Sequence, residues 1–338
     1  MRYLDTVYVS SYRTKISRSK RYLVINIEGE KTRVPLSSID GVVVVGGASM
    51  TMDAVASCVE NGVRVAVLKR NGALRWSANP PTSGNVELRR RQHHSSEDPE
   101  FRLRLCQNLV AGKLQNSARV ASRWERDSDP LVRQVVRPRV ELIHRRIERL
   151  PSAESDNHVR GIEGDAARAH FACMGTVLQS AGWHFGKRNR RPPRDPVNAL
   201  LSFGYGLLTT EITGALNAVG LDPQFGYLHR DRPGRPGLAL DILEEFRALN
   251  DRFVVRSLKR RQINADDFVV TPGGGTYLSD DGRSKYFRLW EAHKNEAVSH
   301  RVLNRQVERW ALPGVQATLM ARHIRGDIPV YPPFVLQN

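Results

Sequence analysis

The sequence predicts an α+β protein with two domains, a small N-terminal β-rich domain followed by a larger, mainly α-helical one. The chain has 338 residues, which is more than one small core normally accommodates. Residues 1–79 contain short runs rich in Val, Ile, Tyr and Thr, which favour strands. From Pro99 onward, apolar residues recur every three or four positions, which is typical of helices packed on a core.

The β-rich domain is predicted to span residues 1–79. Five strands are expected within it, separated by polar turns, at 3–10, 22–28, 41–45, 63–69 and 73–78. One short helix is expected from Met50 to Asn61, because Gly62 supplies a C-terminal stop signal. The sequence therefore predicts five strands and one helix here.

Residues 80–97 are predicted to be a linker. Prolines and a glycine at 80–84 break both periodicities, and residues 89–96 are polar and charged. His93 and His94 could be metal ligands, but adjacent histidines point apart, so a solvated linker is the favoured interpretation.

The helical domain is predicted over residues 98–328. Helices are expected at 101–126, 130–150, 156–181, 196–218, 237–262 and 288–323, with a polar loop at 186–195. Residues 268–278 are predicted to form a hairpin. Gly273–Gly275 lacks the Lys-Ser/Thr that follows a phosphate-binding loop, so it is interpreted as a turn. Residues 329–338 contain three prolines and are expected to form an extended tail, docked or loose.

The composition restricts the classes of partner. A formal charge of +17 favours a polyanion, and nucleic acid is preferred over a membrane because no apolar run reaches 18 residues. The N-terminus alternates like a strand and lacks the apolar core of a signal peptide. Cys58, Cys106 and Cys173 have no ligand-type spacing and are interpreted as buried apolar residues in a reducing compartment. These features together predict a cytoplasmic protein.

Three motifs carry the candidate chemistry. Glu163 lies in Gly-Ile-Glu-Gly, His229 ends Leu-Asp-Pro-Gln-Phe-Gly-Tyr-Leu-His, and Asp241 and Glu244 are neighbours on one helix face. Carboxylates with one imidazole are a ligand set for Mg²⁺ or Mn²⁺, which in a basic chain indicates phosphodiester chemistry. Each motif alone has a plainer interpretation: a solvated glutamate, an acidic face balanced by arginines such as Arg247, or a structural loop histidine.

The three motifs occur together, in this order, in one family. The chain resembles the CRISPR-associated endonuclease and integrase of spacer acquisition, the first-numbered Cas protein, over essentially its whole length. The matching segments are Gly161–Gly164, Leu221–His229 and Arg235–Arg247. The family often has Tyr where His170 stands, a small polar residue at Gly237 and Leu at Ile242. Length and tail are most similar to type I-C members.

The resemblance implies a metal site and a reaction. Glu163, His229 and Glu244 would bind Mn²⁺ or Mg²⁺, with Asp241 as an accessory acid. The 3′ end of a short duplex would attack a repeat phosphodiester and release the old 3′ end, so no ATP is required. Water in place of the 3′-hydroxyl would give nuclease activity.

Basic residues near the motifs are the expected DNA contacts, although each run could instead be a solvated face. Tyr205 could stack on a base or contact a phosphate, whereas the plainer interpretation is a core tyrosine. The candidate DNA-binding residues are Lys187, Arg188, Arg190, Arg191, Tyr205, Arg230, Arg232, Arg235, Arg247, Arg256 and Lys259.

The resemblance also implies partners. These are double-stranded DNA (prespacer and repeat), a second copy of the chain paired through the β domain, the small second Cas protein and an adaptation-associated Cas nuclease. Two other functions remain open at this point. One is a DNA-repair nuclease acting on branched DNA, and the other is a non-catalytic basic scaffold whose acids only balance charge.

Overall fold

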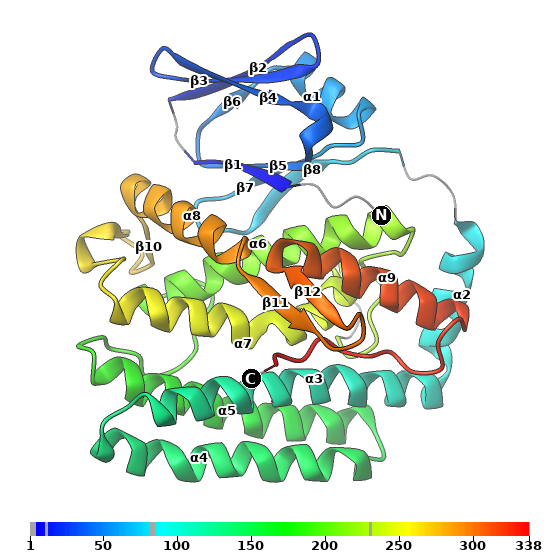
Figure 1. Ribbon diagram of the computed structural model, residues 1–338, viewed down its shortest axis with the longest axis vertical. Coiled ribbons are helices and arrows are strands. Elements are labelled where there is room, and N and C mark those ends of the chain that lie inside the picture. The colour runs from blue at the N-terminus through cyan, green and yellow to red at the C-terminus, as the bar shows by residue number, and fades with distance from the viewer. Residues whose placement is uncertain (1–4, 11–12, 82–84, 230–231, 338) are drawn as a thin grey trace.

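The computed structural model describes residues 5–10, 13–81, 85–229 and 232–337. A β region lies on one side of a larger helical region, as Figure 1 shows with the strands in blue at the top. The α+β prediction is confirmed. The division into domains at residues 79, 97 and 328 stays a prediction, because sheet and helix bounds alone do not define domains.

Two four-stranded sheets form the β region. The first has the order β1 (Asp5–Val9), β5 (Ile39–Val45), β7 (Arg64–Leu68) and β8 (Leu74–Ala78), with only β8 antiparallel to its neighbour. The second has the order β4 (Glu30–Pro35), β3 (Tyr22–Ile27), β2 (Thr14–Ser19) and β6 (Ser49–Met50). Helix α1 (Met52–Glu60) packs on β2 and β7. Strands β2, β4 and β6 were not predicted, because their exposed positions carry polar side chains and the burial signal is short.

The predicted linker contains a helix. Helix α2 covers Val86–Glu97, and the side chain of Asn85 caps it by accepting the Leu88 N–H over 3.2 Å. The segment is polar, but it is helical, and Leu88 and Gln92 are buried against the helical region; its role as a linker between domains stays a prediction.

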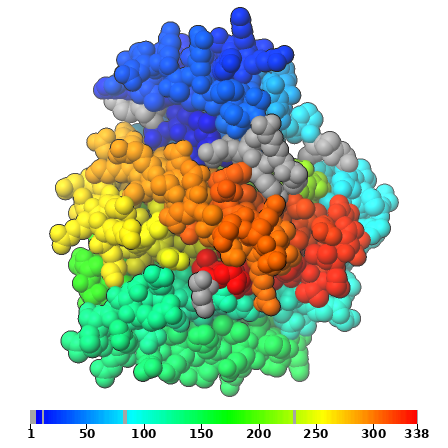
Figure 2. Space-filling model, in the orientation of Figure 1, coloured from blue at the N-terminus to red at the C-terminus, as the bar shows by residue number. Residues whose placement is uncertain are grey.

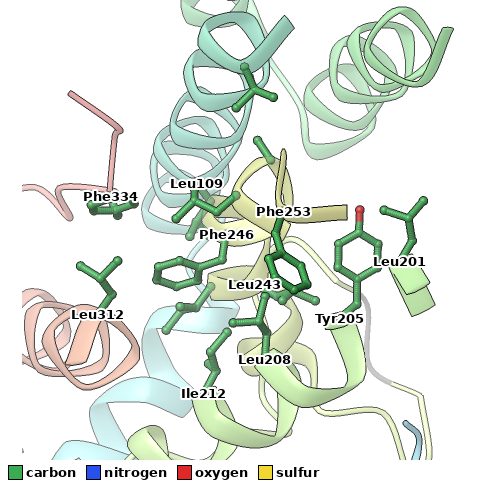
Figure 3. Close-up of a cluster of buried hydrophobic side chains, with 14 of the residues drawn as sticks. Leu109, Leu201, Tyr205, Leu208, Ile212, Leu243, Phe246, Phe253, Leu312 and Phe334 are labelled. Atoms are coloured by element: carbon green, nitrogen blue, oxygen red, sulfur yellow. The ribbon is translucent and has the colours of Figure 1, made fainter. Parts of the chain in front are cut away.

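Five long helices follow: α3 (Pro99–Arg126), α4 (Pro130–Arg149), α5 (Asp156–Gln179), α6 (Pro196–Val219) and α7 (Gly237–Lys259). All five were predicted. Ser or Asp caps, in three cases followed by Pro, mark the N-termini of α3, α4, α5 and α6. The helices that pack closely against each other are α4 with α5, α3 with α7, α3 with α4, and α6 with α7. Figure 3 shows the core between them, where Leu109 of α3, Leu208 of α6 and Phe246 of α7 meet.

The C-terminal third differs from the prediction. The hairpin of β9 (Phe268–Val270) and β10 (Thr276–Leu278) is confirmed. In place of one helix at 288–323 there are α8 (Asp280–Lys294), a hairpin of β11 (Ala297–His300) and β12 (Arg305–Glu308), and α9 (Leu312–Arg325). The hairpin turns at Asn304, whose φ of 47° is unfavourable inside a right-handed helix.

The extended tail is docked. Tyr331, Phe334 and Leu336 are buried, and Figure 2 shows little of the tail between α3 and the β11–β12 hairpin. Asn116 of α3 accepts the Leu336 N–H over 2.8 Å and donates to the Phe334 carbonyl over 2.9 Å. Glu245 of α7 accepts from the Tyr331 hydroxyl over 2.5 Å and from the Phe334 N–H over 2.7 Å.

Close contacts join the β region to α6 and α8. The Tyr8 hydroxyl of β1 donates to Glu211 of α6, and Lys294 of α8 contacts Glu211 over 3.1 Å. A Cβ on Gly206 would lie 2.3 Å from the Gly72 carbonyl oxygen, so α6 can approach the β7–β8 turn only with glycine there.

The three cysteines are free and buried, as predicted. Burial raises the pKa of Cys58 to about 11 and that of Cys173 to about 12, so neither is a thiolate near neutrality. None of the described helices is both long and apolar enough to cross a membrane.

Candidate metal centre and nucleic-acid interface

The three sequence motifs converge in the structure. Glu163 lies on α5, Glu244 lies on α7, and His229 ends the loop that leads toward α7. The motif residues therefore come from three separate segments that packing brings together.

Helix α2 and two glycines hold the histidine loop against the start of α7. The Gln92 amide donates to the Asp222 carbonyl over 2.8 Å and accepts the Asp222 N–H over 2.9 Å. A Cβ on Gly226 would lie 2.6 Å from the carbonyl carbon of Gly237, so the motif needs glycine at both positions for this approach. His93 stacks on Phe225 with ring centroids 4.0 Å apart, which is a packing contact.

Asp241 is fully buried and fixes His229. Its carboxylate accepts the N–H groups of Tyr227 (2.6 Å), Leu228 (3.1 Å) and His229 (2.9 Å), and it contacts His229 Nδ1 over 2.7 Å. An ionised carboxylate only accepts hydrogen bonds, so Nδ1 carries the proton and Nε2 keeps its lone pair. His229 Nε2 faces Glu244, with Oε1 of Glu244 at 3.7 Å.

A lysine that the sequence analysis did not identify lies between the two glutamates. The Lys113 ammonium of α3 pairs with Glu163 and, over 2.5 Å, with Oε2 of Glu244. No sequence signal distinguished Lys113, since it lies beside the apolar stripe of α3 in no motif. In the described parts of the chain, no three His, Cys, Asp or Glu side chains are arranged to hold an ion.

Arg247 completes the charge balance of Glu244. Its Nε donates to Oε1 of Glu244 over 2.8 Å, one helical turn away on α7. Burial alone would raise the pKa of Glu244, but the positive charges of Arg247 and Lys113 outweigh it and hold this pKa well below its usual range. Glu244 is therefore ionised although its side chain is only 4% exposed.

Two clefts share Glu163, His229 and Glu244 as lining residues. The first is strongly basic at its rim, and its other lining residues are Asn157, Arg160, Leu228, Arg232 and Arg235. The second continues over α3 and α6, and its other lining residues are Lys113, Ser117, Ala167, His170, Phe171, Arg190, Tyr205, Arg247 and Asp251. Asn157 and Arg160 were not identified from the sequence either, although Arg160 lies one residue before the first motif.

Tyr205 is held in the wall of the second cleft. Its hydroxyl donates to Asp251, which also contacts His170 Nε2 over 2.9 Å. The Arg247 guanidinium lies 4.7 Å from the Tyr205 ring centroid. The ring is 7% exposed and already stacked, so the core interpretation of Tyr205 fits this placement better than base stacking.

The predicted DNA-contacting residues fall into three groups. The first group lies at or near the clefts. Arg232 and Arg235 line the first cleft, and Arg190 lines the second. Lys187 and Arg191 also belong to this group, because they are exposed in the same loop as Arg190, before α6. Arg230 lies outside the described residues. Those already engaged in the fold are Arg247 and Arg188.

Arg188 supports the loop that carries its neighbours. It donates to Asn198 over 2.7 Å and to Ser202 over 2.9 Å, and burial lowers its pKa to about 10. Arg256 and Lys259 form the third group, because they lie twelve and fifteen residues beyond Glu244 on α7. At 1.5 Å per residue this is roughly 18–22 Å along the helix. Arg256 pairs there with Glu296 over 3.0 Å.

Comparison with known proteins finds a matching family model and relatives that are similar over nearly the whole chain. The family model described as "CRISPR associated protein Cas1" matches residues 7–292. The chain is 39% identical to "CRISPR-associated endonuclease Cas1 2" of Rhodospirillum rubrum, with 98% of each chain covered.

Solved structures share the fold. "Casposase bound to integration product" superposes with a TM-score of 0.84 at 22% identity, covering 97% of this chain and 93% of that one. A "Cas6-RT-Cas1--Cas2 complex" chain gives a TM-score of 0.81 at 20% identity and covers 99% of this chain, which spans 36% of that chain.

Proposed function

Because the chain belongs to the Cas1 family, the endonucleases and integrases of CRISPR spacer acquisition, we propose that Glu163, His229 and Glu244 are the ligands of its catalytic divalent ion. The observation that carries this proposal is the meeting of both carboxylates at one cation, the Lys113 ammonium, with His229 Nε2 alongside. Two carboxylates and one imidazole suit Mn²⁺ or Mg²⁺, whereas none of the three buried cysteines, whose thiolates would favour Zn²⁺, lines either cleft.

The residues around the ligands support this assignment. Asp241 keeps the proton of His229 on Nδ1, which leaves Nε2 free to coordinate; a carboxylate behind a ligating histidine commonly has this role. Arg247 keeps Glu244 ionised. Asp241 is thus proposed to position the histidine without coordinating the ion.

The reaction is a transfer between phosphodiesters. A bound Mg²⁺ or Mn²⁺ supplies Lewis-acid stabilisation of the charge that develops on the phosphate. The 3′-hydroxyl of the incoming duplex forms the new P–O bond while the bond to the old 3′ oxygen breaks, so the number of phosphodiesters is conserved. With water as the nucleophile the same site hydrolyses DNA. Arg232 and Arg235 line the first cleft and are proposed to hold the flanking phosphates. Arg160 lines the same cleft but donates to the Leu228 carbonyl over 2.9 Å, so it is assigned a supporting role for the histidine loop.

Arg190, Arg191 and Lys187 are proposed to extend the DNA path beyond the second cleft. Arg190 lines that cleft and the other two are exposed in the same loop. Contacts of this kind are independent of sequence and sensitive to salt. Arg188 is assigned a supporting role, because its guanidinium already bonds to α6.

Partners are proposed from relatives. The solved complex above contains Cas2, and a "CRISPR-associated exonuclease Cas4/endonuclease Cas1 fusion" of Geobacter sulfurreducens is 35% identical over 97% of this chain. We infer that the chain acts with a Cas2-type protein and a Cas4-type nuclease on double-stranded prespacer and repeat DNA. Homodimerisation through the β region and a type I-C origin are further proposals, based on the resemblance alone.

The test separates catalysis from binding. Glu163→Gln and His229→Ala should lower Mn²⁺-dependent strand transfer into repeat DNA at least about 100-fold, because the metal stabilises the transition state. Duplex affinity, measured by fluorescence anisotropy, should stay nearly constant. Glu148→Gln, an exposed glutamate of α4, is the control and should change neither quantity. Wild-type transfer by the Glu163 variant would refute the metal assignment, whereas a wild type without any Mn²⁺-dependent transfer or cleavage would favour a basic scaffold.

A second assay, with a repeat array as the substrate, distinguishes the integrase from a repair nuclease that acts on branched DNA. Insertion of a short duplex into a repeat array, with both strands joined at the repeat ends, is expected of the integrase and not of a junction-resolving nuclease. Products confined to cut branched DNA would favour the repair function.

A further inference from the structure

Lys113 occupies the position where the proposed metal ligands meet. Its ammonium contacts one oxygen of Glu163 and one of Glu244, and its side chain is only 12% exposed. The two carboxylates come from different helices, so neither contact follows from local spacing along α3. Lys113 therefore already serves as the cation for the buried Glu244 and the partly exposed Glu163.

The charges around this point balance without any other ion. Glu163 and Glu244 contribute two negative charges, and Lys113 and Arg247 contribute two positive ones. A divalent ion added beside an unmoved ammonium would leave these pairs with two excess positive charges, and the Asp241 carboxylate behind His229 offsets only one of them. Such an excess is costly in a medium of low dielectric constant.

The lysine can leave without disturbing the helices. Its four-carbon stem is flexible, and it lines the second cleft together with Ser117, one turn along α3, and with Arg190. An ammonium displaced into that cleft loses its carboxylate partners and gains proximity to any phosphate bound there. A DNA phosphate would also supply the negative charge that the incoming metal requires.

We propose that Lys113 is an internal competitor for the metal position, displaced when the divalent ion enters, and that it then binds a phosphate of the DNA. Metal affinity is therefore low in the free protein and rises when DNA is present, so metal and DNA binding reinforce each other. This inference rests on the proposed function, because it takes Glu163 and Glu244 as the metal ligands.

The test is an Mn²⁺ titration by calorimetry, without DNA and with a short duplex that carries a 3′-deoxy end to prevent reaction. Lys113→Met keeps the length of the stem and removes the charge. Without DNA, this variant should bind Mn²⁺ about tenfold more tightly than the wild type. The duplex should strengthen Mn²⁺ binding in the wild type and much less in the variant.

Thermal unfolding provides a second readout. Lys113→Met should melt at a lower temperature than the wild type in chelator, because Glu163 then lacks its cation and Glu244 keeps only Arg247. Mn²⁺ should raise the Tm of this variant by more than it raises that of the wild type. Lys113→Gln, whose amide can still donate hydrogen bonds, serves if the methionine variant does not fold.

Lys294→Met is the matched control. Lys294 is also buried in an ion pair, with Glu211, but lies at the junction with the β region and lines neither cleft with Glu163. The Lys294→Met substitution should lower the Tm and leave the affinity for Mn²⁺ unchanged.

The outcomes distinguish the two proposals. In one outcome, the wild type binds Mn²⁺, Glu163→Gln abolishes this binding, and neutral variants of Lys113 bind Mn²⁺ no more tightly than the wild type. The competitor role of Lys113 is then refuted, and the metal site stands. If Mn²⁺ binding does not depend on Glu163, the metal site itself fails, and the lysine inference fails with it.

Discussion

Asp241 and His229 are joined twice, through the imidazole Nδ1 at 2.7 Å and through the backbone N–H at 2.9 Å. One carboxylate thereby sets both the position of the loop and the orientation of the ring. Since its other oxygen accepts the N–H groups of Tyr227 and Leu228, Asp241 is the anchor of the whole second motif.

Asp241→Asn should weaken the site without removing a proposed ligand. The amide keeps one acceptor oxygen, but its NH₂ group would face groups that donate, so the proton on Nδ1 is no longer enforced. We expect a loss of about 10- to 100-fold in Mn²⁺ affinity and in strand transfer. Calorimetry and a transfer assay measure the two losses. Unchanged Mn²⁺ affinity in a folded variant would contradict the positioning role.

Arg232 and Arg235 should contribute to DNA affinity. Replacing both by Ala removes two proposed phosphate contacts, so the slope of log affinity against log salt concentration should become shallower by about two. Anisotropy titrations at several salt concentrations measure this slope. Arg301→Ala with Arg305→Ala, on a hairpin turn that lines neither cleft, removes the same charge and should change the slope little. Equal effects of the two pairs would rule out a local contact.

Arg188 should behave differently from its neighbours Arg190 and Arg191. Because its guanidinium bonds to Asn198 and Ser202, Arg188→Ala should lower the free energy of unfolding by about 1–3 kcal/mol. Urea denaturation measures this loss. If Arg188→Ala is as stable as the wild type but binds DNA poorly, Arg188 contacts DNA directly and its supporting role is contradicted.

Glu245 should make stability depend on pH. Burial raises its pKa to about 8, although hydrogen bonds from Tyr331, Phe334 and Gln316 oppose the shift. Between the ordinary value of 4.5 and about 8, the folded chain keeps a proton that the unfolded chain has released. This contribution to stability is complete below pH 4.5 and declines as pH rises toward 8, by about 1.4 kcal/mol per pH unit.

Glu245→Gln removes the titrating group, so the stability of the wild type relative to this variant should fall as pH rises from 5 to 8. Urea unfolding at each pH gives the two curves. Parallel curves would show that Glu245 does not titrate in this window.

The docked tail should contribute to global stability. Phe334 is 1% exposed and stacks on Phe246 of α7, so Phe334→Ala should cost about 3–5 kcal/mol in unfolding free energy. Val330→Ala, in the same tail but 56% exposed, should stay within about 0.5 kcal/mol of the wild type. A small effect at Phe334 would mean that the tail is released in solution.

The periodic parts of the fold could be predicted from sequence, and the locally ambiguous parts could not. Helices α3 to α7 follow from long apolar stripes, and α3 to α6 also have clear N-terminal caps. The α8–β11–β12–α9 segment was predicted as one helix, because a hairpin of four-residue strands carries too little pattern to compete with flanking helical periodicity. Helix α2 was missed because only Leu88 and Gln92 of it are buried.

The same limit applies to the site. The positions of Glu163, His229 and Glu244 could be found because recurring motifs surround them. Lys113 could not be found, since its role comes from the packing of α3 between α5 and α7. Conversely, Arg188 has the right charge for DNA, but the sequence did not reveal that Asn198 and Ser202 already bond to it. The pairing of Arg247 with the acids of its own helix was the plainer alternative in the sequence, and the structure has it with Glu244.

The close approach of Gly206 to Gly72 has a thermodynamic consequence for the whole chain. The β region cannot separate from α6 without opening this contact and exposing the buried Glu211–Lys294 pair. Separate melting of the two regions would therefore wet that pair on the helical side and would leave Arg64 of β7 without the Thr210 carbonyl of α6 to which it donates. Scanning calorimetry should accordingly show one heat-absorption peak whose calorimetric and van't Hoff enthalpies agree, so that the two regions constitute a single cooperative unit.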